Sequence, residues 1–174
     1  MSELADLLRD IPDFPKPGIV FKDITTLLRD PSGLRRAIDH FADRYSDRGL
    51  SAVVGVESRG FIFGAALADR LGVGFVPVRK PGKLPAETLR EEYSLEYGTD
   101  ALEIHRDALS PGDRVVIIDD LLATGGTLAA TVRLVQALHA EVEEVAVLIE
   151  LAFLPGRKNL SGVPVHSVIV VEGE

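Results

Sequence analysis

Two adjacent carboxylates, Asp119 and Asp120, stand just before a turn that is rich in threonine and glycine. Neighbouring carboxylates repel each other unless a cation or hydroxyl groups lie beside them, so this pair is a candidate for binding a sugar diol near a divalent metal. In the turn, glycines let backbone N–H groups approach an anion, which suits a phosphate monoester. The residues of the turn are Ala123, Thr124, Gly125, Gly126 and Thr127. The acids alone could be solvated turn residues, but together with this turn they predict a site for a phosphorylated sugar.

The elements that must position this site are a buried strand and a helix. Four β-branched residues at 115–118 are typical of a strand buried on both faces, and a helical pattern follows at about 127–139. We therefore expect the acids at the carboxyl end of the strand, where open α/β sheets bind ligands. The turn lacks the Lys-Ser/Thr pair of a Walker A loop and the G-x-G-x-x-G spacing of a dinucleotide-binding loop.

A second turn of this kind follows the apolar residues 52–56, which also read as a buried strand. This turn contains Ser58 and Arg59 and leads into a helix at about 61–71. Arg59 could bind a second anion such as pyrophosphate, or it could form a structural salt bridge. The residues of the turn leave both readings open.

The polar segment 79–90 is long for a connection in a compact domain, and such loops are often functional or mobile. It is either a solvated linker or, beside a polyanionic substrate, a source of diphosphate ligands, which would be Arg79, Lys80 and Lys83. Glu96 is a lone acid in the next segment, and most such acids are surface residues. The histidines show no metal-ligand spacing.

Strands alternate with helices along most of the chain, which predicts an α/β fold with a mostly parallel sheet and helices on both faces. A hairpin at 93–105 and the N-terminal stretch fall outside that pattern, and we expect them to form a small hood over the carboxyl edge of the sheet. The other expected elements are helices at 2–9 and 31–48, an extended segment at 19–24, strands at 73–78, 145–149 and 165–171, the last at a sheet edge, and a polar loop at 156–159.

The length of 174 residues suits one domain, 1–174, with a core at about 31–174 and hood contributions from about 1–30 and 79–105. A formal net charge of −8 argues against a general nucleic-acid or membrane-surface role. The chain has no cysteine, which excludes disulfides and thiolate chemistry and fits a cytoplasmic setting. The N-terminus does not resemble a signal peptide, and no apolar run reaches the length of a membrane span.

The order of five segments resembles that of the type I phosphoribosyltransferases, and in particular of the adenine phosphoribosyltransferases. The segments are FPKPGIVFKDI at 14–24, ESRGF at 57–61, RKPGKLP at 79–85, YSLEYG at 93–98 and VVIIDDLLATGGT at 115–127. The last of them would identify only the superfamily, whereas the first and fourth resemble the adenine enzymes specifically. The resemblance implies the type I phosphoribosyltransferase fold. It also implies that adenine and phosphoribosyl diphosphate (PRPP) are converted to AMP and pyrophosphate with Mg²⁺ by a homodimer.

The resemblance also implies roles for single residues. Asp119 and Asp120 would bind the ribose hydroxyls and, through PRPP and water, the metal, while residues 123–127 would hold the 5′-phosphate. Pyrophosphate would be bound by Arg59, Lys80 and Lys83, with Ser58 and Arg79 beside them. Adenine would be enclosed by Val20, Lys22, Leu121 and Leu151. Glu96 would exchange a proton with the purine, and Tyr97 would help to close the hood.

Two other functions fit the same PRPP motif. A phosphoribosyltransferase for xanthine or hypoxanthine would need hydrogen-bond donors where the amino group of adenine needs acceptors. A PRPP-sensing regulator without catalysis would carry a basic DNA-binding segment, and residues 1–21 are too short and not basic enough. Lys22 departs from the Arg that some adenine enzymes carry, and lysine lacks the planar group that stacks on a base.

Overall fold

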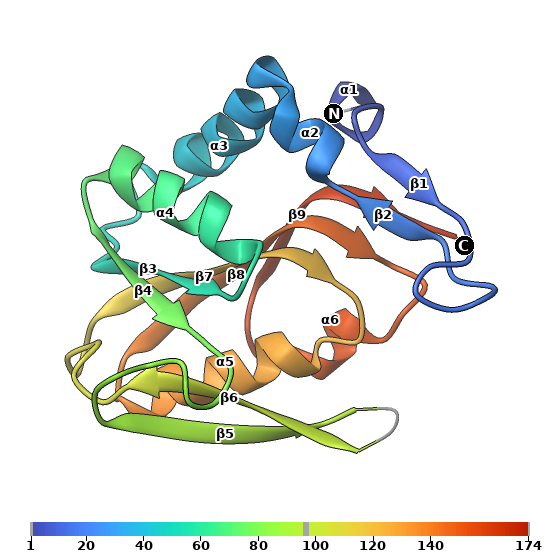
Figure 1. Ribbon diagram of the computed structural model, residues 1–174. Helices are drawn as coiled ribbons and strands as arrows, with labels where there is room; N and C mark the ends of the chain where they lie inside the picture. Colours follow the sequence, from blue (N-terminus) through green and yellow to red (C-terminus); the bar gives the residue numbers. More distant parts are fainter. Residues whose placement is uncertain (1, 96–97, 174) are drawn as a thin grey trace.

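The computed structural model describes residues 2–95 and 98–173, which include a five-stranded parallel sheet with helices on both faces (Figure 1). The strand order is β4-β3-β7-β8-β9, which confirms the α/β class and places the last strand at an edge. The strands are β3 (Ala52–Val56), β4 (Gly74–Val78), β7 (Arg114–Leu122), β8 (Glu141–Leu151) and β9 (Val165–Val171). The helices are α1 (Ser2–Ala5), α2 (Thr25–Arg29), α3 (Pro31–Tyr45), α4 (Gly60–Leu71), α5 (Gly126–Ala137) and α6 (Gly156–Asn159).

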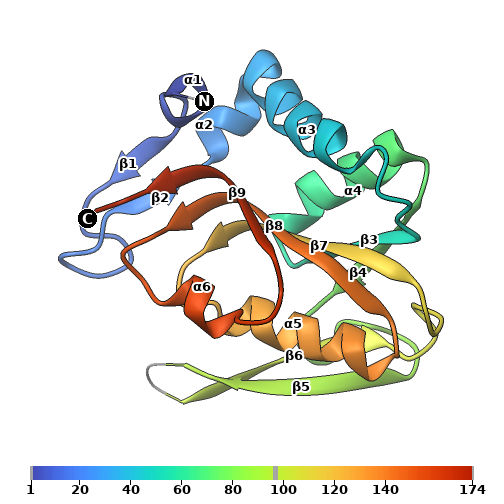
Figure 2. The same cartoon turned by 180° about the vertical axis from the view of Figure 1, so that it is seen from behind.

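The central strand β7 separates two layers of the hydrophobic core (Figures 1 and 2). Val116 and Ile118 pack on the side of α3 and α4, whereas Val115 and Ile117 pack on the side of α5. All four side chains are 0% exposed, as expected for a strand that is covered on both faces. The strand is thus held rigidly where it delivers the two acids to the sheet edge.

Several boundaries differ from the sequence prediction. Strand β7 does not end before the acids but continues to Leu122, because Asp119 and Leu122 still pair with β8. The predicted polar loop at 156–159 is the short helix α6, and the predicted helix at 2–9 ends at Ala5. The short helix α2 is not foreseen, although its Leu27 is 0% exposed.

Two small antiparallel sheets flank the carboxyl edge of the main sheet from different sides (Figures 1 and 2). One pairs β1 (Arg9–Ile11) with β2 (Phe21–Asp23), and the other is the hairpin of β5 (Thr88–Ser94) and β6 (Thr99–His105). The hairpin packs against α5, and a bridge between Arg79 and Glu103 ties it to the end of β4. The two parts expected to make the hood are therefore separate sheets. Among the described residues, no helix is both long enough and apolar enough to span a membrane.

Candidate active site

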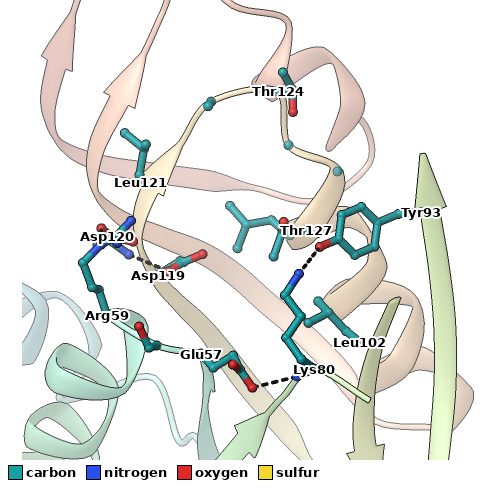
Figure 3. A pocket seen from close by; sticks show the side chains of 15 residues that line it. Glu57, Arg59, Lys80, Tyr93, Leu102, Asp119, Asp120, Leu121, Thr124 and Thr127 are labelled. Atoms are coloured by element: carbon teal, nitrogen blue, oxygen red, sulfur yellow. Dashed lines mark hydrogen bonds and ion pairs between the residues drawn. The ribbon is translucent and has the colours of Figure 1, made fainter. Parts of the chain in front are cut away.

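A cavity of about 450 Å³ lies at the carboxyl ends of β3 and β7 (Figure 3). It is lined by most of the residues expected to bind PRPP, namely Ser58, Arg59, Lys80, Asp119, Asp120, Ala123, Thr124, Gly125, Gly126 and Thr127, and by Leu121, which is expected beside adenine. The lining also contains residues for which the sequence predicts no role, namely Glu57, Tyr93, Leu102 and Leu128. The predicted sugar–phosphate site is therefore one continuous cavity.

The acidic pair lies buried at the floor of this cavity. Asp120 accepts a short hydrogen bond from Arg59 Nε, while Asp119 Oδ1 accepts a hydrogen bond from the backbone N–H of Asp120 at 2.8 Å. Burial, and after it the negative charge of Asp120, raises the pKa of Asp119 well above its ordinary value. One guanidinium thus faces two carboxylates, so a ligand that brings hydroxyl groups or a cation would relieve the repulsion.

The turn that carries Arg59 is pressed against the acidic strand. A Cβ on Gly60 would lie 2.8 Å from the carbonyl oxygen of Ile118 and 3.0 Å from Asp119 Oδ1, so only glycine fits at the start of α4. The Arg59 guanidinium lies 5.9 Å from the ring centroid of Phe21, which belongs to β2. The close approach of α4 to β7 therefore fixes Arg59 between the acids and the N-terminal sheet.

The glycine turn after β7 is shaped by its own backbone and by α6. Gly125 has a φ of +83°, a left-handed conformation that favours glycine, and α5 begins at the next residue. Asn159 Nδ2 donates a hydrogen bond of 2.7 Å to the carbonyl oxygen of Thr124. A Cβ on Gly156 would lie only 2.3 Å from the carbonyl oxygen of Ala123. Helix α6 therefore packs directly against the turn and supports it. The sequence does not indicate this contact.

The cations expected to bind diphosphate divide into two groups. Arg59 and Lys80 line the cavity, whereas Arg79 and Lys83 do not. Arg79 Nε donates to Glu57 Oε1 at 3.3 Å, and its guanidinium lies 5.9 Å from the ring centroid of Phe61. The side chain of Lys83 is exposed, so this lysine lies outside the site as the structure describes it.

A second, mainly apolar cavity of about 340 Å³ adjoins the first and shares Thr124 with it. Its lining contains Val20, Lys22 and Leu151, which are expected around the base, whereas Leu121 lines the first cavity instead. It also contains residues for which the sequence predicts no role, namely Gly18, Ile19, Phe153, Leu154 and Gly173. The Lys22 ammonium donates to Asp10 Oδ1 at 2.8 Å. The two cavities thus place an apolar compartment next to the glycine turn.

The remaining two candidates, Glu96 and Tyr97, lie outside the described residues. Their neighbours on the hairpin are described, and Tyr93 of β5 reaches the main cavity (Figure 3). The hairpin thus contributes to the site, as expected. The roles of Glu96 and Tyr97 stay predictions.

Comparison with known proteins identifies the class. Residues 23–172 match the family model of the phosphoribosyl transferase domain, a range that covers the whole main sheet, the acidic pair and the glycine turn. The fold and the cavity therefore define a phosphoribosyltransferase.

The relatives narrow the class further. The adenine phosphoribosyltransferase of Roseiflexus sp. (strain RS-1) is 62% identical, over 97% of this chain and 98% of its own. The crystal structure of the enzyme of that name from Thermoanaerobacter pseudethanolicus is 55% identical, with a TM-score of 0.95 over 98% of this chain and 99% of its own. The Saccharomyces cerevisiae enzyme is 43% identical, with a TM-score of 0.91 over 96% of this chain and 97% of its own. Its crystal structure holds adenine and an imino-altritol bisphosphate. This chain belongs to the adenine phosphoribosyltransferases.

Proposed function

We propose that this protein transfers the phosphoribosyl group of PRPP to adenine, giving AMP and pyrophosphate. The observation that carries the proposal is the junction of the two cavities at Thr124. The first cavity offers carboxylates and a glycine turn to a sugar phosphate, and the second offers apolar walls to a planar base. Substrates in the two cavities would be neighbours, as transfer of the sugar to the base requires.

The residues of the first cavity suit the charge that develops during this transfer. Loss of pyrophosphate builds positive charge on the ribose, and the carboxylates of Asp119 and Asp120 would stabilise it and orient the hydroxyl groups. Arg59 and Lys80 would bind the departing pyrophosphate. The backbone N–H groups at the start of α5 would hold the 5′-phosphate, because the N-terminus of a helix favours negative charge.

We propose Mg²⁺ as the metal of the reaction, on the chemistry of the donor set. Three carboxylates, those of Glu57, Asp119 and Asp120, face two cations in the cavity lining, and PRPP adds further negative charge. The described residues contain no cluster of three or more metal-ligating side chains. Asp119 and Asp120 would therefore hold the metal indirectly, through PRPP and water. When bound, Mg²⁺ neutralises the charge of the leaving diphosphate.

For the base, we propose that Val20 and Leu151 enclose adenine, with Leu121 contributing from the lining of the first cavity. Because the Lys22 ammonium is paired with Asp10, Lys22 would meet the base with its other atoms. Glu96 would move the proton of the purine, since a positioned carboxyl group assists a weak nitrogen nucleophile. Tyr97 would help to exclude water, which would otherwise hydrolyse PRPP.

The organisation of the protein is proposed on the family resemblance. The chain would act as one phosphoribosyltransferase domain, with a core at about 31–174 and hood contributions from about 1–30 and 79–105. It would work in the cytoplasm as a homodimer, on small-molecule substrates and without nucleic acid or membrane partners.

A base screen tests the proposed function. Purified protein is incubated with PRPP, Mg²⁺ and, in separate reactions, adenine, hypoxanthine, guanine or xanthine, and the nucleotide products are separated by chromatography. We expect AMP from adenine and little product from the other bases. Product only from an oxopurine would favour the other transferase, and PRPP binding without product from any base would favour the regulator. The adenine enzymes among the relatives do not favour either alternative.

A further inference from the structure

The wall of the main cavity that is formed by the hairpin holds one of the two cavity cations. Tyr93 of β5 and Asp100 of β6 are opposite each other in the hairpin, so their side chains lie on the same face. The Tyr93 hydroxyl accepts a hydrogen bond from Lys80 Nζ at 3.1 Å (Figure 3). The same hydroxyl donates to Asp100 Oδ2 at 3.2 Å. Lys80 Nζ also donates a short hydrogen bond to Asp100 Oδ2. These three side chains form a closed triangle, which we call the Lys80 triangle.

Each member of the Lys80 triangle is fixed from another side. The backbone N–H of Lys80 donates to Glu57 Oε1 at 2.7 Å, and Asp100 Oδ1 accepts from the backbone N–H of Ala101 at 2.8 Å. The ring of Tyr93 is buried against the start of α5, where a Cβ on Gly126 would lie 3.2 Å from it. The triangle is therefore part of the built cavity wall and not a chance contact of a flexible lysine.

The charges in the Lys80 triangle are complementary. The hydrogen bond from Lys80 lowers the pKa of Asp100. Burial is the largest single influence on Lys80 and opposes its charge. The hydrogen bonds to Asp100 and Tyr93, together with the charge attraction of these two groups, outweigh burial and raise the pKa of the lysine. Lys80 lines the cavity, whereas Asp100 does not. The cation is thus within reach of a ligand while its counter-ion lies behind it.

We propose that Asp100 is a positioning residue that holds the Lys80 ammonium against the hairpin and competes with diphosphate for it. The inference rests on the proposed function, because it assumes that a diphosphate enters this cavity. The diphosphate must draw Lys80 away from Asp100, and Asp100 takes the lysine back when pyrophosphate leaves. Because Lys80 must leave Asp100 to bind diphosphate, diphosphate binds more weakly than it would if Lys80 had no carboxylate partner. The same competition makes release of pyrophosphate easier.

The test is the affinity for Mg²⁺-pyrophosphate, measured by titration calorimetry on the full chain. Asp100→Asn keeps the size of the side chain but removes the competing charge. Because partly exposed ion pairs are worth little, we expect the dissociation constant to fall only about two- to five-fold. Asp100→Ser makes the same charge change with a smaller side chain and should tighten binding similarly. Unchanged or weaker binding in both variants would overturn the proposal.

Two matched measurements separate this role from a general change in charge. Glu92→Gln makes the same charge change one residue before Tyr93, on the side chain that pairs with Arg90, and should leave pyrophosphate binding unchanged. In a Lys80→Met background, Asp100→Asn should no longer tighten binding, because the exchange needs the lysine. Equal tightening in Glu92→Gln, or tightening that persists without Lys80, would refute the proposed route. A wild-type protein that binds no Mg²⁺-pyrophosphate would instead refute the proposed function, and the inference with it.

Discussion

The glycine turn rests on α6, and this contact allows a sharp test through Gly156→Ala. The added methyl group would lie 2.3 Å from the carbonyl oxygen of Ala123 and 2.7 Å from Leu122 Cδ1. Since an ordinary contact is about 3.4 Å, the turn and α6 must move apart by about 1 Å. The φ of Gly156 does not lie in the left-handed region, so the effect is one of space and not of backbone conformation.

The displacement should affect stability and catalysis together. Overpacking costs about 1–3 kcal/mol, which lowers the thermal midpoint of a chain of this size by about 3–10 °C. A misplacement of about 1 Å at a substrate-binding turn can cost up to about 100-fold in rate. We therefore expect kcat/KM for PRPP to fall about 10- to 100-fold, mainly through a higher KM for PRPP, because the turn holds the 5′-phosphate in our proposal.

Initial rates of AMP formation at varied PRPP measure this effect, well below the thermal midpoint of the variant. Gly74→Ala is the matched control, because a Cβ at Gly74 meets nothing within 4 Å and its φ is also outside the left-handed region. The control should keep wild-type kinetics. If Gly156→Ala kept kcat/KM for PRPP within about twofold of wild type, this would show that α6 does not position the turn.

Other predictions concern the acids, the hairpin and a histidine pair. Asp119→Asn combined with Asp120→Asn should abolish activity and weaken PRPP binding, and an unchanged PRPP titration would refute the assignment. Asp119→Asn alone should raise the thermal midpoint measured without ligand. Burial raises the pKa of this carboxyl, so its charge destabilises the native state at neutral pH, and asparagine carries no charge. Glu96→Gln should lower turnover markedly while PRPP still binds, and near-normal rates would exclude proton transfer by this residue. His166, whose Nε2 lies 2.8 Å from His40 Nε2, has a pKa lowered to about 4 by burial and then by a nearby arginine. Below about pH 6.5 the unfolded chain therefore binds a proton at His166 that the native state does not bind. As the pH falls from about 6.5 to 4, the free energy of unfolding should decrease by about 1–2 kcal/mol, after allowing for solvent screening. His166→Gln should flatten this dependence in urea unfolding, and an unchanged slope would contradict it.

Local composition was enough to predict the parts of the site that follow each other in the chain. The β-branched residues 115–118, the acids and the glycine turn follow one another closely, so a short window of sequence indicates all three. The predicted end of β7 is wrong because pairing with β8, and not the composition of the strand, determines where the strand ends. Short elements such as α2 depend on tertiary contacts, as in the hydrogen bond from Thr26 Oγ1 to the carbonyl oxygen of Leu7 at 2.6 Å.

The rest of the site depends on contacts between residues that are far apart in sequence. Gly156 supports the turn at 123–127, which lies 29 to 33 positions before it, and nothing in the residues next to Gly156 indicates that role. In the sequence Asp100 has no feature that distinguishes it from other acids in turns, whereas in the structure it accepts a hydrogen bond from Lys80. Phe153 and Leu154 line the apolar cavity only because β8 ends beside β2. Such pairings cannot be inferred from one sequence, since no local pattern records them.

The buried acidic pair also bears on how long the protein survives. An ionised carboxylate that is buried beside another costs free energy, so a ligand that satisfies the pair makes the fold more stable. A ligand at about 100 times its dissociation constant adds about 2.7 kcal/mol to the free energy of unfolding. Where local opening limits degradation, that difference lengthens the half-life of the chain by up to about 100-fold. The supply of PRPP would then regulate the amount of this enzyme as well as its rate.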